Sequence, residues 1–424
     1  MEVVAFYALL VGVAIVLFYG LRRRYGYLQL PCLTAAVFLC WVIPQLWLIR
    51  QLYGNFASEY LVVLHFFCLA CLIAVDIGWR SGVQSGKAVV IADAVTDESL
   101  VAICIAITLV AWVMVLGIGT RALEERASST WSGPLTIMYF FSNIKVISLF
   151  LSIYLFLRRR NTVIVLLLVA NIGLYAPALF LVFRRRAMLE AFTCITLALW
   201  FSRRIIIPRV VITTAIPIGM LIVFSVGSLR DLGNVHTGEP TLLSAKDIAT
   251  VDFWAATPFM KDTSAPEMTN AFNMVRISAD SDAHTYGAAS WNRLIFQWIP
   301  GQIVGADVKQ NLMLDVATAQ QIVAAYKEDL RIGSTPTAMG EAYLEFGIFG
   351  IVFFLATGYV AGRWWTRANR GSRTAMCLYS AGLSAAVIMP TAYAIYFFNI
   401  IALYAGTFFI VSNLFSKQDL GKSL

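Results

Sequence analysis

The stretch VIVLLLVANIGLYAPALFLVFRRRAMLE, Val163–Glu190, joins a long apolar run to three consecutive arginines. A helix that crosses the ~30 Å hydrocarbon core of a membrane needs about 20 apolar residues, and Val163–Phe183 has about that length. Similar segments recur along the chain, so the sequence predicts an all-α polytopic integral membrane protein with about 11 transmembrane helices. The predicted spans are Val3–Gly20, Pro31–Ile49, Tyr60–Trp79, Leu100–Gly119, Leu135–Leu157, Val163–Phe183, Ala187–Phe201, Val210–Gly227, Phe346–Gly362, Ala375–Met389 and Ala392–Phe415.

The composition supports the same class. Of the 424 residues, 59% are hydrophobic and 13% are charged, whereas soluble domains have about 45–50% apolar and about 25% charged residues. The net charge of +8 comes mainly from basic clusters beside apolar segments, where Lys and Arg set orientation, so we expect no nucleic-acid binding. The chain has no GxGxxG, P-loop or HExxH motif, so nothing supports nucleotide-driven or zinc-peptidase chemistry.

The basic clusters predict one orientation for the spans. Arg22–Arg24, Arg158–Arg160, Arg203–Arg204 and Arg363–Arg373 each lie beside the end of an apolar segment, and such clusters favour the cytoplasmic side. One threading satisfies all of them, with the N-terminus outside and the C-terminus inside.

Arg184–Arg186 are the exception, because this threading makes them the outward tip of a hairpin. The second arm, Ala187–Phe201, has 15 residues and covers only ~22 Å at about 1.5 Å per residue. The arginines would then lie below the outer surface, where cations are costly and usually functional. In the alternative interpretation, one arm is re-entrant and the triplet is an ordinary cytoplasmic anchor.

One long polar segment divides the chain into three parts. We expect transmembrane helices 1–8 in residues 1–227, a large extracytoplasmic loop with short helices in 228–345, and transmembrane helices 9–11 in 346–424. The loop is mixed in charge and is long enough to fold over one face of the membrane.

The outward segments carry a set of candidate phosphate-binding arginines. Guanidinium groups suit phosphate because they stay charged and offer a planar fork of donors. In the other interpretation, each loop arginine only pairs with a nearby aspartate. The candidates are Arg184, Arg185, Arg186, Arg230, Arg276 and Arg293.

The end of the loop carries a carboxylate pair in GSTPTAMGEAYLEFGIFG, Gly333–Gly350. Glu341 and Glu345 are four residues apart and share a face if this part is helical, so one of them could act as a general base. Both could equally have structural roles, as a cap or a helix-orienting residue. Aromatic side chains that could contact sugar rings are Tyr286, Trp291 and Tyr343.

These motifs resemble the Wzy-type polymerases of O-antigen and exopolysaccharide repeat units. The resemblance rests on Tyr286-Gly287, Leu294, Ile299-Pro300, Lys309, Ser334, Gly340-Glu341, Tyr343, Phe346-Gly347 and Gly350, and on the arginines at 184–186 and 230. The chain departs from the family at IPGQIVGADVKQ, where members often have an Arg after the Pro and later aromatic and Pro residues; Arg293 could substitute for that Arg.

The resemblance implies an inverting glycosyltransferase of the C type in the bacterial inner membrane, with its active site facing the periplasm. Its donor and acceptor would be glycans on undecaprenyl pyrophosphate, without a cofactor or metal, and a chain-length regulator is a plausible partner. The arginines, Arg230 included, would hold the pyrophosphate, and Glu341 or His284 would deprotonate the acceptor hydroxyl.

Two other functions stay open at this point. An O-antigen ligase would pass the same donor glycan to lipid A core, and a flippase would use the arginines only to grip headgroups. Two ionisable residues inside predicted spans, Lys145 and His65, are further functional candidates, although a packing role is favoured for His65.

Overall fold

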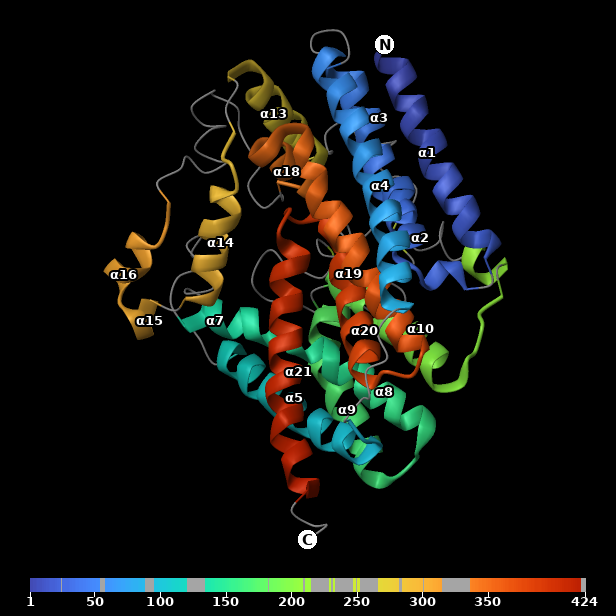
Figure 1. Ribbon diagram of the computed structural model, residues 1–424, viewed down its shortest axis with the longest axis vertical. Helices are drawn as coiled ribbons and strands as arrows, with labels where there is room; N and C mark the ends of the chain where they lie inside the picture. Colours follow the sequence, from blue (N-terminus) through green and yellow to red (C-terminus); the bar gives the residue numbers. More distant parts are fainter. Residues whose placement is uncertain are drawn as a thin grey trace.

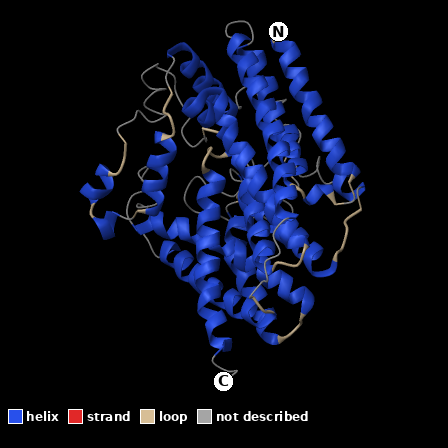
Figure 2. Ribbon diagram, in the orientation of Figure 1, coloured by secondary structure: helices blue, strands red, loops and turns tan. Residues whose placement is uncertain are grey.

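The protein is helical throughout the part of the chain that the computed structural model describes. The described residues are 1–23, 25–53, 58–87, 95–119, 134–181, 183–208, 210–214, 229, 232, 247–248, 250–251, 266–281, 284–299, 301–314 and 336–420. No strand occurs among them (Figure 2). The predicted all-α class is therefore confirmed for these residues.

Nine helical segments in the described residues are long and apolar enough to cross a membrane. This arrangement is compatible with a multi-pass membrane protein. The segments are α1 (Glu2–Arg22), α2–η2–α3 (Leu30–Val37, Phe38–Val42, Ile43–Tyr53), α4 (Ser58–Lys87), α5 (Asp97–Gly119), α7–η3–α8 (Pro134–Phe141, Ser142–Ile144, Lys145–Arg158), α9–η4 (Thr162–Ala176, Pro177–Leu181), α18–η6–α19 (Ala338–Phe346, Gly347–Gly350, Ile351–Asn369), α20–η7 (Arg373–Ile388, Met389–Thr391) and α21 (Tyr396–Leu420).

Two of the eleven predicted spans are not among the nine. The segment predicted at Ala187–Phe201 does form a helix, α10 (Arg185–Arg203), but its charged residues lower its hydropathy below that of the others. Most of the segment predicted at Val210–Gly227 lies outside the described residues. The count of eleven spans stays a prediction.

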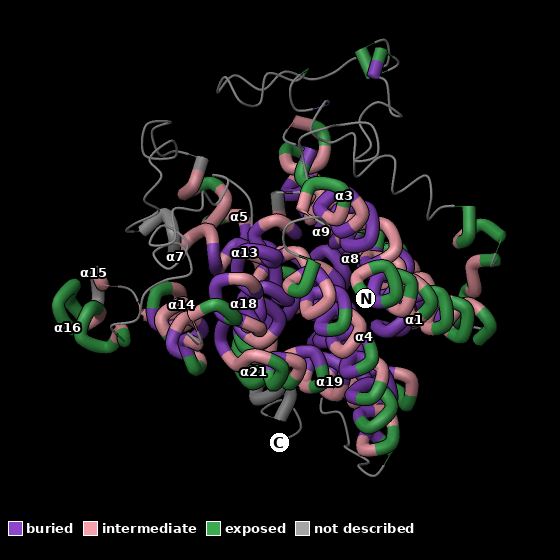
Figure 3. The backbone as a smooth tube through the Cα atoms, turned by 90° about the horizontal axis from the view of Figure 1, so that it is seen from above, coloured by how far each residue is buried: buried purple, intermediate pink, exposed green. Residues whose placement is uncertain are grey.

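The burial of the helices is graded from the centre of the bundle outward (Figure 3). In the apolar window of α20, 83% of the residues are buried, against 22% for α1 and 28% for α5. The outward faces of the peripheral helices are nevertheless apolar, with Val11, Val113 and Leu166 each more than half exposed. Water would disfavour such faces, whereas lipid would accept them.

The closest helix contact is between α4 and α19, which run parallel. A Cβ atom on Gly78 would lie 2.0 Å from the Leu355 carbonyl oxygen, and one on Gly82 would lie 2.1 Å from that of Tyr359. In the other direction, a Cβ on Gly358 would lie 2.3 Å from the Val75 oxygen. The two backbones touch because these positions carry no side chain, as in small-residue helix pairs of membranes.

In the long polar segment, α13 (Pro266–Ser281) lies at the end of the bundle where α1 and α4 begin, whereas α14 (Ala288–Trp298), α15 (Gly301–Val304) and α16 (Ala306–Asn311) lie beside the bundle (Figure 1). We call the end where α1 and α4 begin the α13 end. The opposite end, where α1, α4 and α19 finish, is called the Arg370 end. α13 packs against α18, with Gly340 close to the Ala271 backbone. The short helix η1 (Gly26–Leu28) follows α1.

Candidate functional site

The arginine triplet lies where the chain turns from α9 into α10. The π-helical turn η4 ends the first arm, and Phe183 adopts a positive φ of 49°. The Arg184 N–H donates back to the Ala178 carbonyl at 2.8 Å, and α10 begins at Arg185. The hairpin predicted between the two arms therefore has a tight, hydrogen-bonded tip.

Arg184 and Arg185 point to different neighbours from this tip. Arg184 is exposed, donates to the Tyr139 hydroxyl and lies over the Tyr139 ring. Arg185 is half-buried, with its guanidinium 4.7 Å from the centre of the Trp41 ring. Trp41 lies twelve residues before the end of α3 at Tyr53, about 18 Å of helix. Arg185 is therefore well below the α13 end; its depth in a membrane stays a prediction.

A carboxyl group from α13 adds a negative partner to Arg185. Glu267 interacts electrostatically with Arg185 and accepts from the Gln45 side chain. Burial raises the pKa of Glu267, and Gln45 and the positive charge of Arg185 oppose that shift. Arg185 thus draws α10, η2 and α13 together.

Arg186 is the most constrained of the three arginines. Its Nε donates to Glu190 Oε1 at 2.6 Å, and an η nitrogen donates to Asn143 Oδ1. Its guanidinium lies 5.4 Å from the Tyr396 ring centre. Glu190 is 3% exposed and also accepts from the Tyr175 hydroxyl at 3.1 Å. This buried carboxylate holds Arg186 in one orientation.

A second arginine–carboxylate pair is formed by Arg293 of α14 and Glu341 of α18. Arg293 donates to Glu341 Oε1, and the Ala394 N–H donates to Oε2 at 2.7 Å. The guanidinium lies 4.0 Å from the Tyr393 ring centre. Glu341 is 1% exposed, so both of its oxygens are enclosed and have partners.

The Arg186–Glu190 pair and the Arg293–Glu341 pair meet at the turn between α20 and α21. The rings of Tyr393 and Tyr396 lie 5.1 Å apart, with Arg293 over the first and Arg186 over the second. Tyr393 also interacts electrostatically with Arg186. We call Arg186, Arg293, Tyr393 and Tyr396, with Glu190 and Glu341, the arginine site.

Lys145 borders this site, and its neighbours there were not predicted from the sequence. It lies 5.0 Å from the centre of the Tyr175 ring and interacts electrostatically with Glu190 and Arg186. His65, the other ionisable residue inside a predicted span, is fully buried and packs edge-on against Phe6.

Glu345 has a structural partner. Its carboxylate accepts from the Ser290 N–H at 2.6 Å and from the Ser290 hydroxyl at 2.8 Å. Ser290 lies in the first turn of α14, where free N–H groups need acceptors. Glu345 therefore fixes α14 on α18, which in turn aims Arg293 at Glu341.

His284 lies beside the same helix with its two ring nitrogens in different surroundings. Its Nδ1 lies 3.3 Å from the Leu344 carbonyl oxygen and 3.0 Å from the Ser278 hydroxyl. A carbonyl can only accept, so donation to Leu344 requires a proton on Nδ1, whereas donation from the Ser278 hydroxyl to Nδ1 requires that nitrogen to be unprotonated. The first arrangement is the tautomer that a general base at Nε2 requires.

The predicted sugar-binding aromatics divide into exposed and packed side chains. Tyr286 is 74% and Trp291 45% exposed, so both offer ring faces to a ligand. Tyr343 is half-buried and packs edge-on against Phe67, 5.2 Å between ring centres.

Two predicted phosphate contacts remain, Arg276 and Arg230. Arg276 is half-buried on α13. Arg230 lies outside the described residues. The assignment of both to a pyrophosphate stays a prediction.

Comparison with protein-family models, with curated proteins and with solved structures finds no match to this chain. The class that the structure itself defines is an all-helical protein whose apolar helices are compatible with a multi-pass membrane protein.

The buried Arg293–Glu341 pair predicts that the loss of stability caused by substituting Arg293 depends on the residue at position 341. Arg293→Met leaves the buried Glu341 carboxylate without its cation, which is expected to cost about 3–5 kcal/mol of stability. Adding Glu341→Gln removes the charge and keeps an oxygen for the Ala394 N–H, so the double variant is expected to recover most of the loss. Thermal unfolding in detergent measures both; a double variant that unfolds as early as Arg293→Met would contradict the pairing.

Proposed function

We propose that the protein is a membrane glycosyltransferase that polymerises undecaprenyl-pyrophosphate-linked repeat units at the periplasmic face of a bacterial inner membrane. The observation that carries this proposal is the convergence of Arg186 and Arg293, 107 residues apart in the sequence, on the adjacent rings of Tyr393 and Tyr396. Two fixed guanidiniums and a nearby lysine, within a bundle of apolar helices, suit the pyrophosphate of a lipid carrier.

The proposed topology has eleven spans, the N-terminus outside and the C-terminus inside. The basic ends of α1, α8, α10 and α19 then face the cytoplasm, as the positive-inside rule favours. The α13 end becomes the periplasmic face, and the architecture is that of a C-type glycosyltransferase.

In the proposed reaction, a hydroxyl of one lipid-linked repeat unit attacks the anomeric carbon of the growing glycan from the face opposite the pyrophosphate. The new glycosidic bond forms as the carbon–oxygen bond to pyrophosphate breaks, so the configuration inverts. Charge develops on the departing pyrophosphate, and preorganised cations stabilise it without reorganising. The products are the longer glycan on the acceptor lipid and undecaprenyl pyrophosphate.

The hydroxyl proton needs a base, and two candidates differ in their surroundings. Glu341 accepts from Arg293 and the Ala394 N–H, so proton transfer to it requires the ion pair to open. Among the described residues, His284 has no carboxylate or arginine partner to release, and donation from its Nδ1 to the Leu344 carbonyl would leave Nε2 as the basic nitrogen. We therefore favour His284 as the base, with Glu341 as the residue that positions Arg293.

The remaining parts of the proposal concern the substrates and partners. Tyr286 and Trp291, with exposed rings, and the half-buried Tyr343 would contact the incoming sugars. The arginines and Lys145 would supply the positive charge, so the proposed reaction assigns no metal or cofactor, and a chain-length regulator would act as a partner in the membrane.

A reconstituted reaction tests the proposal. The purified protein in liposomes receives its native undecaprenyl-pyrophosphate repeat unit, and the products are sized on a gel. A ladder of products that differ by one repeat unit is the expected result. Transfer of a single glycan only when lipid A core is added would instead identify a ligase. Movement of the labelled lipid across the bilayer without any longer product would identify a transporter.

A further inference from the structure

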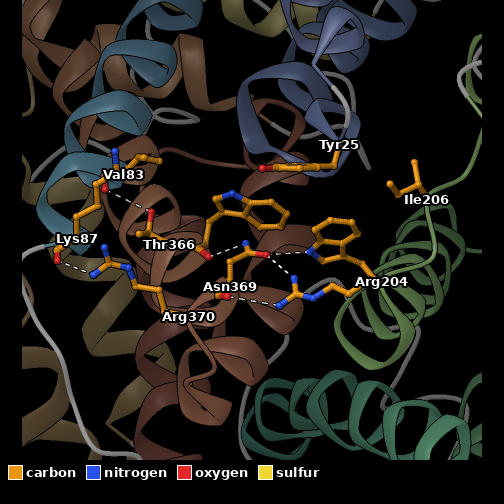
Figure 4. Close-up of a pocket in the computed structure, with 10 residues that line it drawn as sticks. Tyr25, Val83, Lys87, Arg204, Ile206, Thr366, Asn369 and Arg370 are labelled. Carbon is orange, nitrogen blue, oxygen red and sulfur yellow. Dashed lines mark hydrogen bonds between the residues drawn. The ribbon is translucent and has the colours of Figure 1, made fainter.

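A second basic site lies at the Arg370 end, away from the arginine site. A cavity of about 560 Å³ opens there among the final turns of α4, α10 and α19 and the residue before η1 (Figure 4). Arg204, on its wall, follows α10 directly, 18 residues after Arg186, which corresponds to about 27 Å of helix. No part of the proposed function uses this cavity.

Three cationic side chains line the cavity: Lys87, Arg204 and Arg370. Arg204 donates to Asn369 Oδ1 at 2.7 Å, and Arg370 donates to the Lys87 carbonyl at 2.5 Å. These acceptors are neutral, and all three side chains belong to exposed residues. Among the described residues, none of the three forms an ion pair with a carboxylate.

Some other basic residues at the same end do pair with carboxylates. Asp97 pairs with Arg158, Arg159 and Arg373, and Glu98 pairs with Arg159 at 3.0 Å. The fold therefore supplies carboxylates to one group of arginines and, within the described residues, leaves the cavity with an excess of positive charge. An anion from outside the chain would restore the balance.

The backbone at Arg204 adds an independent indication. Arg204 has a φ of 53° and ends α10 in the left-handed conformation, which Gly adopts at little cost and other residues rarely adopt. The conformation directs Arg204 onto Trp200, with 5.1 Å between guanidinium and ring centre. The presence of arginine in a backbone conformation that favours Gly is explained if the guanidinium of Arg204 is needed in the cavity.

The other wall of the cavity is aromatic. Tyr25, Trp200 and Trp365 are mutually in contact, with ring centres 4.9–6.3 Å apart. The cavity lies where α4 and the α18–α19 segment, two of the nine candidate spans, come to an end. Tyr and Trp concentrate at the headgroup level of membranes, and basic pockets between helix ends at that level suit anionic lipid headgroups.

We infer that this cavity binds the phosphate headgroup of an anionic phospholipid. Arg204 and Arg370 hold the phosphate with charge-assisted hydrogen bonds, Lys87 adds a third positive charge, and the aromatic wall contacts the glycerol and upper acyl carbons. With the topology proposed above, the lipid belongs to the cytoplasmic leaflet, although binding itself rests on neither that topology nor the proposed reaction.

The test measures lipid binding directly and needs no enzymatic activity. The full chain, in detergent, is titrated with phosphatidylglycerol and with phosphatidylcholine, and bound lipid is counted by native mass spectrometry. Arg204→Gln and Arg370→Gln are each expected to weaken phosphatidylglycerol binding about tenfold. The matched control is Arg160→Gln, which removes the same charge at the same end from an exposed residue whose guanidinium lies over the Phe156 ring, 5.3 Å from its centre.

Four outcomes would overturn the inference. Equal binding of the two lipids, or equal loss in Arg160→Gln, would mean that no specific headgroup site exists. Displacement of the lipid by millimolar inorganic phosphate would mean that the cavity takes the free anion. Should the variants misfold, a photoactivatable phosphatidylglycerol on the wild-type chain replaces them; it is expected to label the peptide that contains Trp365–Arg370, and labelling only elsewhere would equally refute the site.

Discussion

Arg186→Ala is expected to abolish the product ladder in the reconstituted reaction, with the initial rate lowered at least about 100-fold. Arg186 is the member of the triplet held in place by a buried carboxylate, Glu190, and by Asn143. Removal of one preorganised donor from a developing anion costs about 10²–10³ in rate. Arg186→Lys keeps the charge but loses the planar fork, so an intermediate rate is expected.

The effect of Arg186→Ala on stability has to be separated from its effect on the reaction rate, because the substitution also leaves the Glu190 carboxylate without its cation. The double variant Arg186→Ala/Glu190→Gln removes that buried charge and is expected to unfold later than the single variant, while it stays inactive. Arg160→Ala is the control for loss of one positive charge. A ladder of normal length from folded Arg186→Ala would remove this arginine from the site.

Much of the bundle could be predicted from apolar length alone. Nine of the predicted spans correspond to helices that are long and apolar enough to cross a membrane, because about 20 apolar residues have few other stable arrangements. Boundaries differ where a helix extends beyond its apolar part, as α4 does by running on to Lys87. At α10 the charged residues give a helix whose hydropathy is not that of a span.

The arginine site could be predicted only in part. Arg186 stood out because cations within apolar stretches are rare, and Arg293 because guanidinium groups on an outward loop suit phosphate. Their partners could not be predicted. Tyr393 and Tyr396 lie in an apolar stretch that contains other aromatic residues, and no sequence motif distinguishes them. Glu190 is a single acidic residue on a helix, without a motif that indicates its partner. The Arg293–Glu341 pair joins residues 48 apart, and periodicity carries no information about such a contact.

The α4–α19 contact did have a signal in the sequence. Gly78, Gly82 and Gly86 repeat every four residues, and Gly358 and Gly362 repeat at the same spacing. This small-residue pattern is typical of helices that approach closely in membranes. The pattern alone could not identify which helices pair, since several other segments also contain glycine.

Gly82→Val is expected to disrupt the packing of α4 against α19. Its Cβ would lie 2.1 Å from the Tyr359 carbonyl oxygen, and part of a backbone cannot rotate away as a side chain can. The two helices would have to separate along their shared length. Overpacking usually costs about 1–3 kcal/mol, and we expect this substitution to reach or exceed that range because backbone has to move.

The same displacement should reach the arginine site, because α19 continues from η6 and α18, which carries Glu341. Gly406→Val is the matched control: Gly406 lies in α21, and a Cβ there meets nothing within 4 Å. Size-exclusion profiles and thermal unfolding in detergent should show aggregation or early unfolding for Gly82→Val and near wild-type behaviour for Gly406→Val. Gly82→Ala should lie between them, since it adds the clashing Cβ without the branch. Equal stability of the two valine variants would mean that α4 and α19 do not touch through their backbones.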